Sequence, residues 1–293
     1  MSIATTPVKT LPSNLQKAVA QISEIGSLPE ITARIVEMVE NPLVTAHDMH
    51  SVIRMDPALA AKILKVVNSA FYGLPSQIAS LERAVLLLGL SAVKNIALAA
   101  SLSRLFSADA VSHQFAARDL WRHCIAVGVC ARMLAPTTVC PQPDEMFVAG
   151  LMHDMGLLVE QRLFPDKVRR VAEQCHNRKL SFCETEEAVI GADHQAFGGA
   201  LGRAWKFPPG LCWAMSAHHD SEPAAQPELQ KVADLIYVAD TLCSAQRIGF
   251  WLGAQTQVIG PERLARLGLD QARLEHMTTE LVERVEEAER IFE

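Results

Sequence analysis

The most informative segment of the sequence is Phe147-Val-Ala-Gly-Leu-Met-His153-Asp154-Met-Gly-Leu-Leu-Val159, in which only His153 and Asp154 have polar side chains. A helix that is apolar on every side is buried, so the segment predicts a helix in a protein core. Burying an unpaired carboxylate is costly, so Asp154 needs a cation, a network of donors or a metal. Gly150 and Gly156 leave room for another backbone, or a ligand, beside His153.

Helix signals recur along the rest of the chain, whereas the alternating pattern of strands is scarce. Thr45 with Asp48 predicts a capping box, and Asp56-Pro57 and Ser80 predict two further helix starts. We therefore predict an all-α, multi-helix bundle. The expected helices cover residues 30–40, 47–55, 58–68, 81–88, 114–134, 144–163, 166–178, 184–190, 194–205, 210–218 and 229–246.

The chain of 293 residues has the length of one large domain or two modest ones. The stretch Phe106–Val111 predicts a junction between a first set of helices and the longer helices that follow. We expect two packed subdomains, residues 12–106 and residues 111–246, because the first helices are too apolar to stand alone in water. An acidic helical extension is expected over residues 257–293.

The charge is unevenly distributed. The chain has 27 Lys and Arg against 33 Asp and Glu, a formal net charge of −6. Residues 221–293 carry 7 basic and 13 acidic groups, which accounts for the whole deficit, and the run Glu280–Glu293 predicts a solvated helix face. The first 220 residues are neutral and have no basic stripe, so a nucleic acid is not expected as a partner.

Composition also bears on the compartment. The most apolar stretch, Ala84–Leu102, is interrupted by Gly89, Lys94 and Asn95, so neither a membrane span nor a membrane partner is expected. The seven Cys include no CxxC pair, and Met1–Thr10 has no cationic segment followed by an apolar one. Unpaired thiols without an export signal predict a cytoplasmic protein.

Imidazole and carboxylate groups recur in the second half of the chain. His123 and Asp240 each lie in a largely apolar helix, His194 begins a helix, and His218-His219 end one. Imidazole and carboxylate without thiolate suit Fe, Mn, Zn or Ni rather than a cysteine-bound structural zinc. The candidate metal ligands are therefore His123, His153, Asp154, His194, His218, His219 and Asp240.

Other interpretations of these residues stay open. His153 and Asp154 could form a buried hydrogen-bonded pair that satisfies both groups without a metal. His218 and His219 at a helix end are favoured by the helix dipole alone, and a His at a helix start, such as His194, is commonly exposed.

The order His123, His153-Asp154, Asp240 resembles the HD superfamily of metal-dependent phosphohydrolases. Leu28-Pro-Glu-Ile31, Arg54–Gly73 and Ser80–Leu90 resemble the HDOD domain, the HD-related output domain of bacterial signalling proteins. This likeness runs from about residue 22 to about residue 243, and its stretch Asn68-Ser-Ala-Phe-Tyr-Gly73 is highly specific. The resemblance implies a helical bundle whose second subdomain is HD-like, in a cytoplasmic bacterial signalling protein.

The resemblance implies two possible functions. HDOD domains are usually regulatory modules with a degenerate metal site, so we expect a module that binds a signalling or regulatory protein, as a monomer or homodimer. Its HD-like pocket would hold one or two divalent ions, or none, and its input would come from a separate protein or a ligand.

The alternative is a metal-dependent phosphohydrolase or phosphodiesterase that acts on a nucleotide or cyclic dinucleotide. His123, His153, Asp154 and Asp240 would hold one ion, and His194 with His218 or His219 would hold a second. The extra His residues resemble the dinuclear HD-GYP phosphodiesterases, although the glycine-tyrosine-proline signature of that group is absent. No general acid or substrate-reading motif can be named, so no catalytic residue is assigned and a non-enzymatic module is expected.

Overall fold

The computed structural model describes residues 9, 11–16, 30–69, 72–74, 76–102, 116–138, 142–219 and 226–292. Every regular element within these ranges is helical, which confirms the all-α prediction. None of these helices is long and apolar enough to cross a bilayer. The predicted junction at 106–111 and parts of the quoted motifs, including Leu28 and Phe71, lie outside the described residues, and the subdomain boundaries stay predictions.

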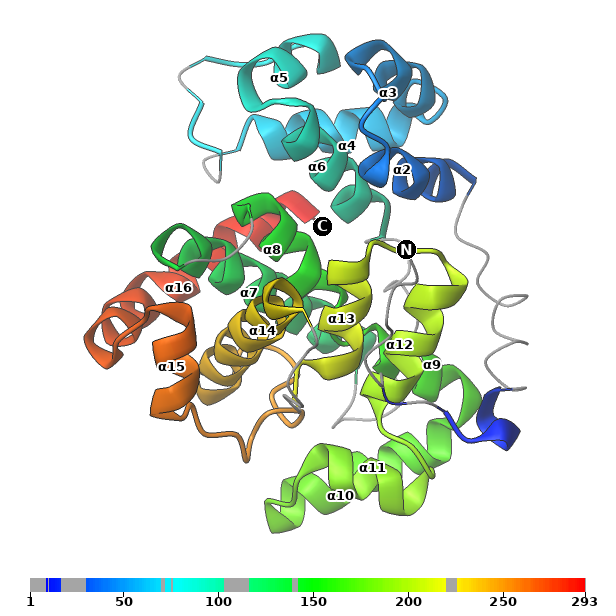
Figure 1. The fold of residues 1–293 in the computed structure, drawn as a ribbon, viewed down its shortest axis with the longest axis vertical. Helices are drawn as coiled ribbons and strands as arrows, with labels where there is room; N and C mark the ends of the chain where they lie inside the picture. The colour runs from blue at the N-terminus through cyan, green and yellow to red at the C-terminus, as the bar shows by residue number, and fades with distance from the viewer. Residues whose placement is uncertain are drawn as a thin grey trace.

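The first group of helices lies at one end of the molecule (Figure 1). The predicted caps form: Thr45 and Asp48 make a capping box, the Asp56 carboxylate accepts from the Leu59 amide, and Ser80 caps the helix that follows it. Local sequence signals therefore set the helix starts in this group. Its members are α2 (Glu30–Glu40), α3 (Ala46–Ile53), α4 (Pro57–Val67), α5 (Leu81–Leu88) and α6 (Leu90–Leu102).

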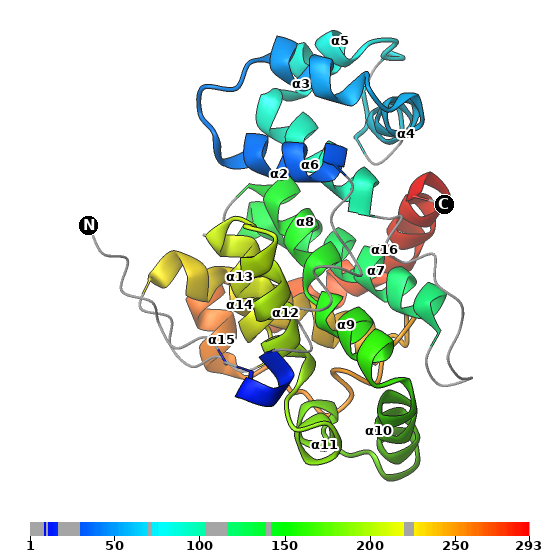
Figure 2. The ribbon, with the colours of Figure 1, turned by 90° about the vertical axis from the view of Figure 1, so that its right-hand side faces the viewer.

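The second group is built around α7 (Ala117–Leu134), which packs against α8 and α14 and is buried along most of its length. A pair of shorter helices, α10 and α11, lies at the end of the molecule farthest from α2–α6 (Figures 1 and 2). The other members are α8 (Pro143–Met152), α9 (Met155–Leu163), α10 (Pro165–Arg178), α11 (Phe182–Val189), α12 (His194–Ala204), α13 (Pro209–Ala217) and α14 (Pro227–Ala245).

The single helix predicted over residues 144–163 is wrong: the chain forms two helices, α8 and α9, with His153 and Asp154 in the turn between them. Hydrophobic periodicity does not reveal this break because the residues on both sides of the turn are apolar and buried. Asp154 takes the N-cap position of α9 but makes no side-chain cap hydrogen bond. Its carboxylate is therefore left to interact with groups from other helices.

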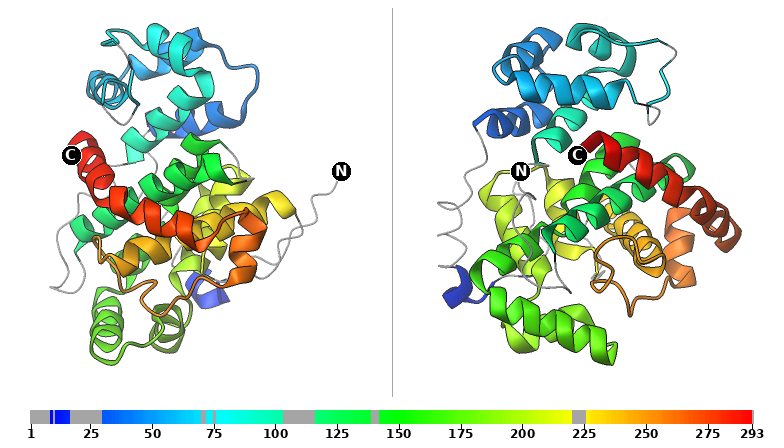
Figure 3. Two further views of the ribbon diagram at one scale, coloured as in Figure 1. Left: turned by 90° about the vertical axis from the view of Figure 1, so that its left-hand side faces the viewer. Right: turned by 180° about the vertical axis from the view of Figure 1, so that it is seen from behind.

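The C-terminal helices α15 (Pro261–Leu267) and α16 (Gln271–Phe292) extend the second group. Helix α16 crosses α7 and reaches α4 (Figure 3). There the Lys65 ammonium donates to the Arg290 carbonyl at 2.5 Å. Its acidic side chains Glu280, Glu283 and Glu286 are exposed, as the charge run predicts. The buried face repeats every three or four residues: Leu274, Met277, Leu281, Val285, Ala288 and Ile291.

Two glycines of the segment Phe147–Val159 allow close approach of neighbouring backbones. A Cβ atom at Gly150 would lie 2.6 Å from the Cα of Gly128, so α7 and α8 touch at their backbones. A Cβ atom at Gly156 would lie 1.8 Å from the carbonyl oxygen of His194. The sequence allowed either another backbone or a ligand beside these two glycines, and another backbone is observed at each of them.

Replacement of Gly150 by Ala is expected to lower the free energy of unfolding by about 1–3 kcal/mol, because the added methyl forces α7 and α8 apart. Helix propensity alone would raise it by up to about 1 kcal/mol, so the sign separates the two effects. Urea denaturation measures the change. Gly210→Ala is the matched control, since a Cβ there meets nothing within 4 Å. Equal stability of the two variants would contradict the packing argument.

Candidate metal centre

The structure brings all seven predicted ligands into one cluster. The turn between α8 and α9 supplies His153 and Asp154, and the first residue of α12 supplies His194. The cluster is closed to solvent: its side chains are at most 2% exposed, except that of His219, which is 5% exposed. The remaining members are His123 from α7, His218 and His219 from the end of α13, and Asp240 from α14.

The Asp154 carboxylate lies at the centre of the cluster. Its Oδ2 lies 3.3 Å from Nε2 of His153 and 3.9 Å from Nε2 of His123. Its Oδ1 lies 3.4 Å from Nε2 of both His194 and His218. Each carboxylate oxygen therefore faces a separate pair of imidazoles.

Asp240 lies beside one of these pairs. Its Oδ1 is 3.0 Å from Nε2 of His123, and its Oδ2 is 3.7 Å from Nδ1 of His219. His219 is oriented differently from the other imidazoles, because its Nδ1 also contacts the side-chain amide of Gln257. Asp240 thus extends the cluster from the His123–His153 side towards His219.

Four imidazoles share one orientation, with Nδ1 turned outward and Nε2 turned inward. Nδ1 lies 2.6 Å from the Gly150 carbonyl in His153, 2.8 Å from the Ala214 carbonyl in His218, and 3.3 Å from the Ile248 carbonyl in His123. A carbonyl only accepts, so these Nδ1 atoms carry the hydrogen and a neutral ring presents a lone pair at Nε2. Histidines that bind metals are held in this way by an outer acceptor.

The donor set fits a divalent cation. His194 and His218 point their Nε2 atoms at each other across 3.2 Å, with Oδ1 of Asp154 beside both. Such converging lone pairs repel unless a cation lies between them. Ligand atoms about 2.1 Å from an ion stand roughly 3.0–3.4 Å apart in octahedral or tetrahedral coordination, which matches these spacings.

Four buried atoms of the cluster make no hydrogen bond to any part of the chain that the structure describes: Nε2 of His153, Oδ1 of Asp154, Nε2 of His219 and Oδ2 of Asp240. A pair of His153 and Asp154 without a metal would leave these groups unsatisfied, at a cost of about 1–3 kcal/mol for each. The cluster can therefore hold a metal ion.

The protonation states of the cluster follow from burial and charge. Burial lowers the pKa of His218 and holds the pKa of His219 well below its usual range. Burial also opposes protonation of His153, but the carboxylates of Asp154 and Asp240 outweigh it and raise the pKa of that imidazole. Burial opposes ionisation of Asp154, yet His153 and the other imidazoles hold its pKa well below the ordinary value.

Glu186, which no pattern in the sequence singles out, holds the His194 ring in place. The Oε2 atom of Glu186 lies 2.7 Å from Nδ1 of His194 and also accepts from the His194 backbone amide at 3.2 Å. Its side chain is fully buried, and burial raises its pKa well above the ordinary value. Glu186 lies among Glu184 and Glu187, so its sequence context is typical of a solvated surface.

Glu160 is the second carboxylate that the sequence reasoning did not single out. Its side chain is buried in α9, and burial, with the nearby Glu186 carboxylate, raises its pKa well above the ordinary value. The available signal was its place directly after the apolar run Leu157-Leu-Val159.

Comparisons with known proteins extend these observations. A family model described as the HDOD domain matches residues 25–221. An uncharacterized protein of Treponema pallidum (strain Nichols) is 25% identical over 235 residues, which cover 80% of this chain and 45% of that protein. The chain thus spans less than half the length of this curated relative.

Three solved structures share the fold. An HDOD domain protein of Geobacter sulfurreducens has a TM-score of 0.78 at 22% identity, covering 94% of this chain and 97% of that one. A protein of Marinobacter aquaeolei VT8, provisionally described as a signal transduction protein, has a TM-score of 0.77 at 23% identity, covering 96% and 64%. A protein of Shewanella amazonensis SB2B, provisionally described as a phosphohydrolase, has a TM-score of 0.72 at 20% identity, covering 94% and 98%.

These identities show a common fold and nothing finer. The family match, in contrast, covers about two thirds of the chain, including the motifs between Arg54 and Leu90 and six of the seven clustered ligands, all but Asp240. The chain belongs to the HDOD domain family.

Proposed function

We propose that this protein is a regulatory module of bacterial signal transduction whose HD-like cluster holds one or two divalent ions, and that it works in the cytoplasm. The observation that carries the proposal is the set of four imidazoles held with Nε2 inward around the Asp154 carboxylate. The Marinobacter structure supports the signalling role through its description and shared fold.

Burial of the ligands supports a regulatory role over turnover. The side chains of His153, His194 and His218 are fully enclosed, so no open ligand face is presented to a large substrate. A bound ion would tie together α7, the α8–α9 turn, α12, α13 and α14, and its binding free energy would add to the stability of the fold. Loss or gain of the ion would then change how firmly these helices are held.

The proposed module acts through a protein partner. Leu86 and Leu87 on α5 are 82% and 50% exposed, although both are large and apolar. Single exposed leucines are common, but two adjacent ones on one short helix form an apolar surface that a partner could cover. Helix α5 lies with the first group of helices at one end of the molecule (Figure 1).

The second candidate is a metal-dependent phosphohydrolase. Asp154 favours it, because each of its oxygens faces a separate imidazole pair, as expected of a carboxylate shared by two ions. When bound, a pair of ions supplies Lewis-acid stabilisation of phosphoryl oxygens and a nucleophile at neutral pH. The Shewanella structure supports this candidate through its description.

Metal analysis of the freshly purified full chain is expected to find at least one equivalent of Fe, Mn, Zn or Ni. Asp154→Ala removes the carboxylate that both imidazole pairs face, so its metal content is expected to fall below about a tenth of an equivalent. His276→Ala, which removes an exposed imidazole of α16, is the control and is expected to retain the metal. Equal metal content in all three proteins would refute the site.

Assays of the metal-loaded chain with bis(4-nitrophenyl) phosphate and with cyclic dinucleotides separate the two candidate functions. We expect no sustained hydrolysis. Turnover that requires the metal and is lost in His153→Ala would instead establish the phosphohydrolase.

Metal affinity is expected to fall as the pH is lowered from about 8 to about 6. The raised pKa of His153 means that this imidazole keeps a proton, without metal, at pH values where an ordinary His has lost it. A metal must displace that proton, whereas His218 and His219, whose pKa values are lowered, are already neutral. Calorimetric titration with Mn²⁺ in two buffers of different ionisation enthalpy measures affinity and proton release. A pH-independent affinity without proton release would contradict this assignment.

Glu186→Gln is expected to weaken Mn²⁺ binding about 10- to 100-fold, because an amide holds the His194 ring less firmly and makes it a weaker ligand. The matched control is Glu187→Gln, which changes an adjacent glutamate that is 55% exposed. The same titration applied to both variants provides the comparison. Glu186 would have no role in positioning the ligand if the two variants bound Mn²⁺ equally well.

A further inference from the structure

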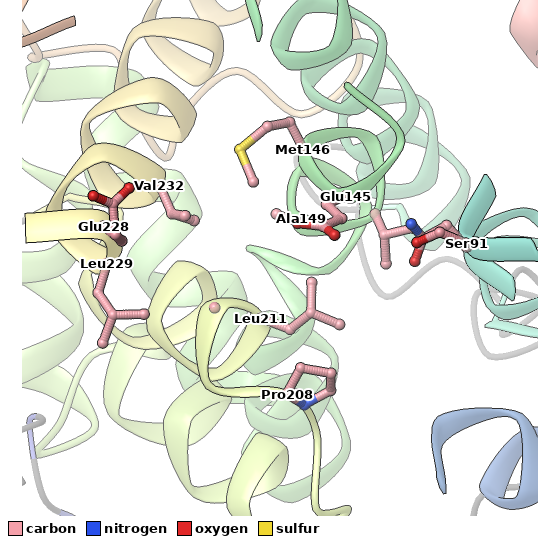
Figure 4. Close-up of a pocket in the computed structure, with 12 residues that line it drawn as sticks. Ser91, Glu145, Met146, Ala149, Pro208, Leu211, Glu228, Leu229 and Val232 are labelled. Carbon is pink, nitrogen blue, oxygen red and sulfur yellow. The ribbon is translucent and has the colours of Figure 1, made fainter. Parts of the chain in front are cut away.

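A second site lies where the two groups of helices meet. A cavity of about 210 Å³ opens between α6, α8, α13 and α14, with side chains of all four helices around it (Figure 4). None of the seven clustered metal ligands lines it. Its walls are mainly apolar and include Met146, Ala149, Pro208, Leu211, Leu229 and Val232.

A mostly buried polar side chain, that of Asn95, lines this cavity. Asn95 lies on α6, lines the cavity and is only 5% exposed. Its side-chain amide makes no hydrogen bond to any of the described residues. The amide is open to the cavity, where a ligand with both donors and acceptors would pair with it.

The first turn of α13 supplies a positive end to the cavity. Gly210 and Leu211 line it, and their backbone amides, which open the nine-residue helix, have no hydrogen-bond partner in the described ranges. No side chain caps α13, and no acidic residue lies in its first turn. Such a helix start binds a carboxylate through its amides and its dipole.

Two carboxylates supply the opposite charge at the rim. Glu145 from α8 and Glu228 from α14 both line the cavity and are exposed to solvent. Glu228 also pairs with Lys231 at 3.3 Å and is 71% exposed, so it can turn towards a bound ammonium group. The cavity therefore has apolar walls, a helix start that can bind a carboxylate, and two glutamates at its opening that can bind an ammonium group.

We propose that this cavity binds a small zwitterion, namely an α-amino acid with an apolar side chain. The carboxylate would meet the first turn of α13, the ammonium would meet Glu145 and Glu228, and the side chain would lie on Met146 and its apolar neighbours. A simple organic anion would be repelled by the two glutamates. A simple cation would leave the start of α13 without a partner.

The position of the cavity makes this ligand an input for the whole molecule. It bridges α6 of the first group to α8, α13 and α14 of the second, and these three helices lead to His153, His218 and Asp240. A ligand that binds here stabilises one arrangement of the two groups by mass action. The site does not depend on the proposed metal, because no metal ligand lines it.

Calorimetric titration of the full chain with L-leucine tests the proposal, both before and after treatment with a chelator. We expect binding in both states, and binding about tenfold weaker or worse for 3-methylbutylamine, which lacks the carboxylate, and 4-methylpentanoate, which lacks the ammonium. Equal binding of either analogue would overturn the assignment as a zwitterion site, and absence of leucine binding would overturn the proposal.

Variants locate the site. Asn95→Leu replaces the amide by an apolar group of similar size and is expected to weaken leucine binding about tenfold. Gly210→Leu is expected to do the same by filling the cavity, and it should fold normally because a Cβ there meets nothing within 4 Å. Ser101→Ala on the same helix as Asn95 is the control. Unchanged binding in Gly210→Leu would place the ligand elsewhere.

Discussion

The buried carboxylate of Asp154 determines how the surrounding helices must be arranged. A lone ionised carboxylate cannot be enclosed in an apolar core, and imidazoles from four parts of the chain converge on it: α7, the α8–α9 turn itself, the start of α12 and the end of α13. Four imidazoles turn Nε2 inward, and each is fixed from behind by a carbonyl or by Glu186. The arrangement makes chemical sense around a cation, because neutral imidazoles held in this way offer lone pairs rather than hydrogens.

The helical architecture brings these groups within reach. The turn between α8 and α9 directs the side chains of His153 and Asp154 into the buried space that they share with α7, α12 and α13, and Gly156 lets the backbone of His194 approach directly. Glycine packing at Gly150 brings α7, with His123, against α8. Helices α8, α13 and α14 begin at the cavity beside α6 and lead to the metal ligands His153, His218 and Asp240. The proposed metal centre and the proposed amino-acid site are therefore held by the same three helices.

Local signals predicted much of the fold and of the cluster. The caps at Thr45, Asp56 and Ser80 formed as expected, since capping depends on neighbouring residues alone. Four of the ligands could be picked out because a polar side chain in a buried apolar segment needs a partner: His123, His153, Asp154 and Asp240. The turn at His153 and the role of Glu186 could not, because both are set by packing between segments distant in sequence and leave no mark on periodicity.

The most direct test of the metal centre is an anomalous-scattering map from crystals of the full chain grown with Mn²⁺. We expect a strong peak beside the Asp154 carboxylate, within bonding distance of the inward Nε2 atoms of His194 and His218 or of His123 and His153, and one peak on each side if two ions bind. A map without a peak there, with the imidazoles hydrogen-bonded directly to Asp154 and Asp240, would refute the metal centre and leave a buried His–Asp network that needs no metal.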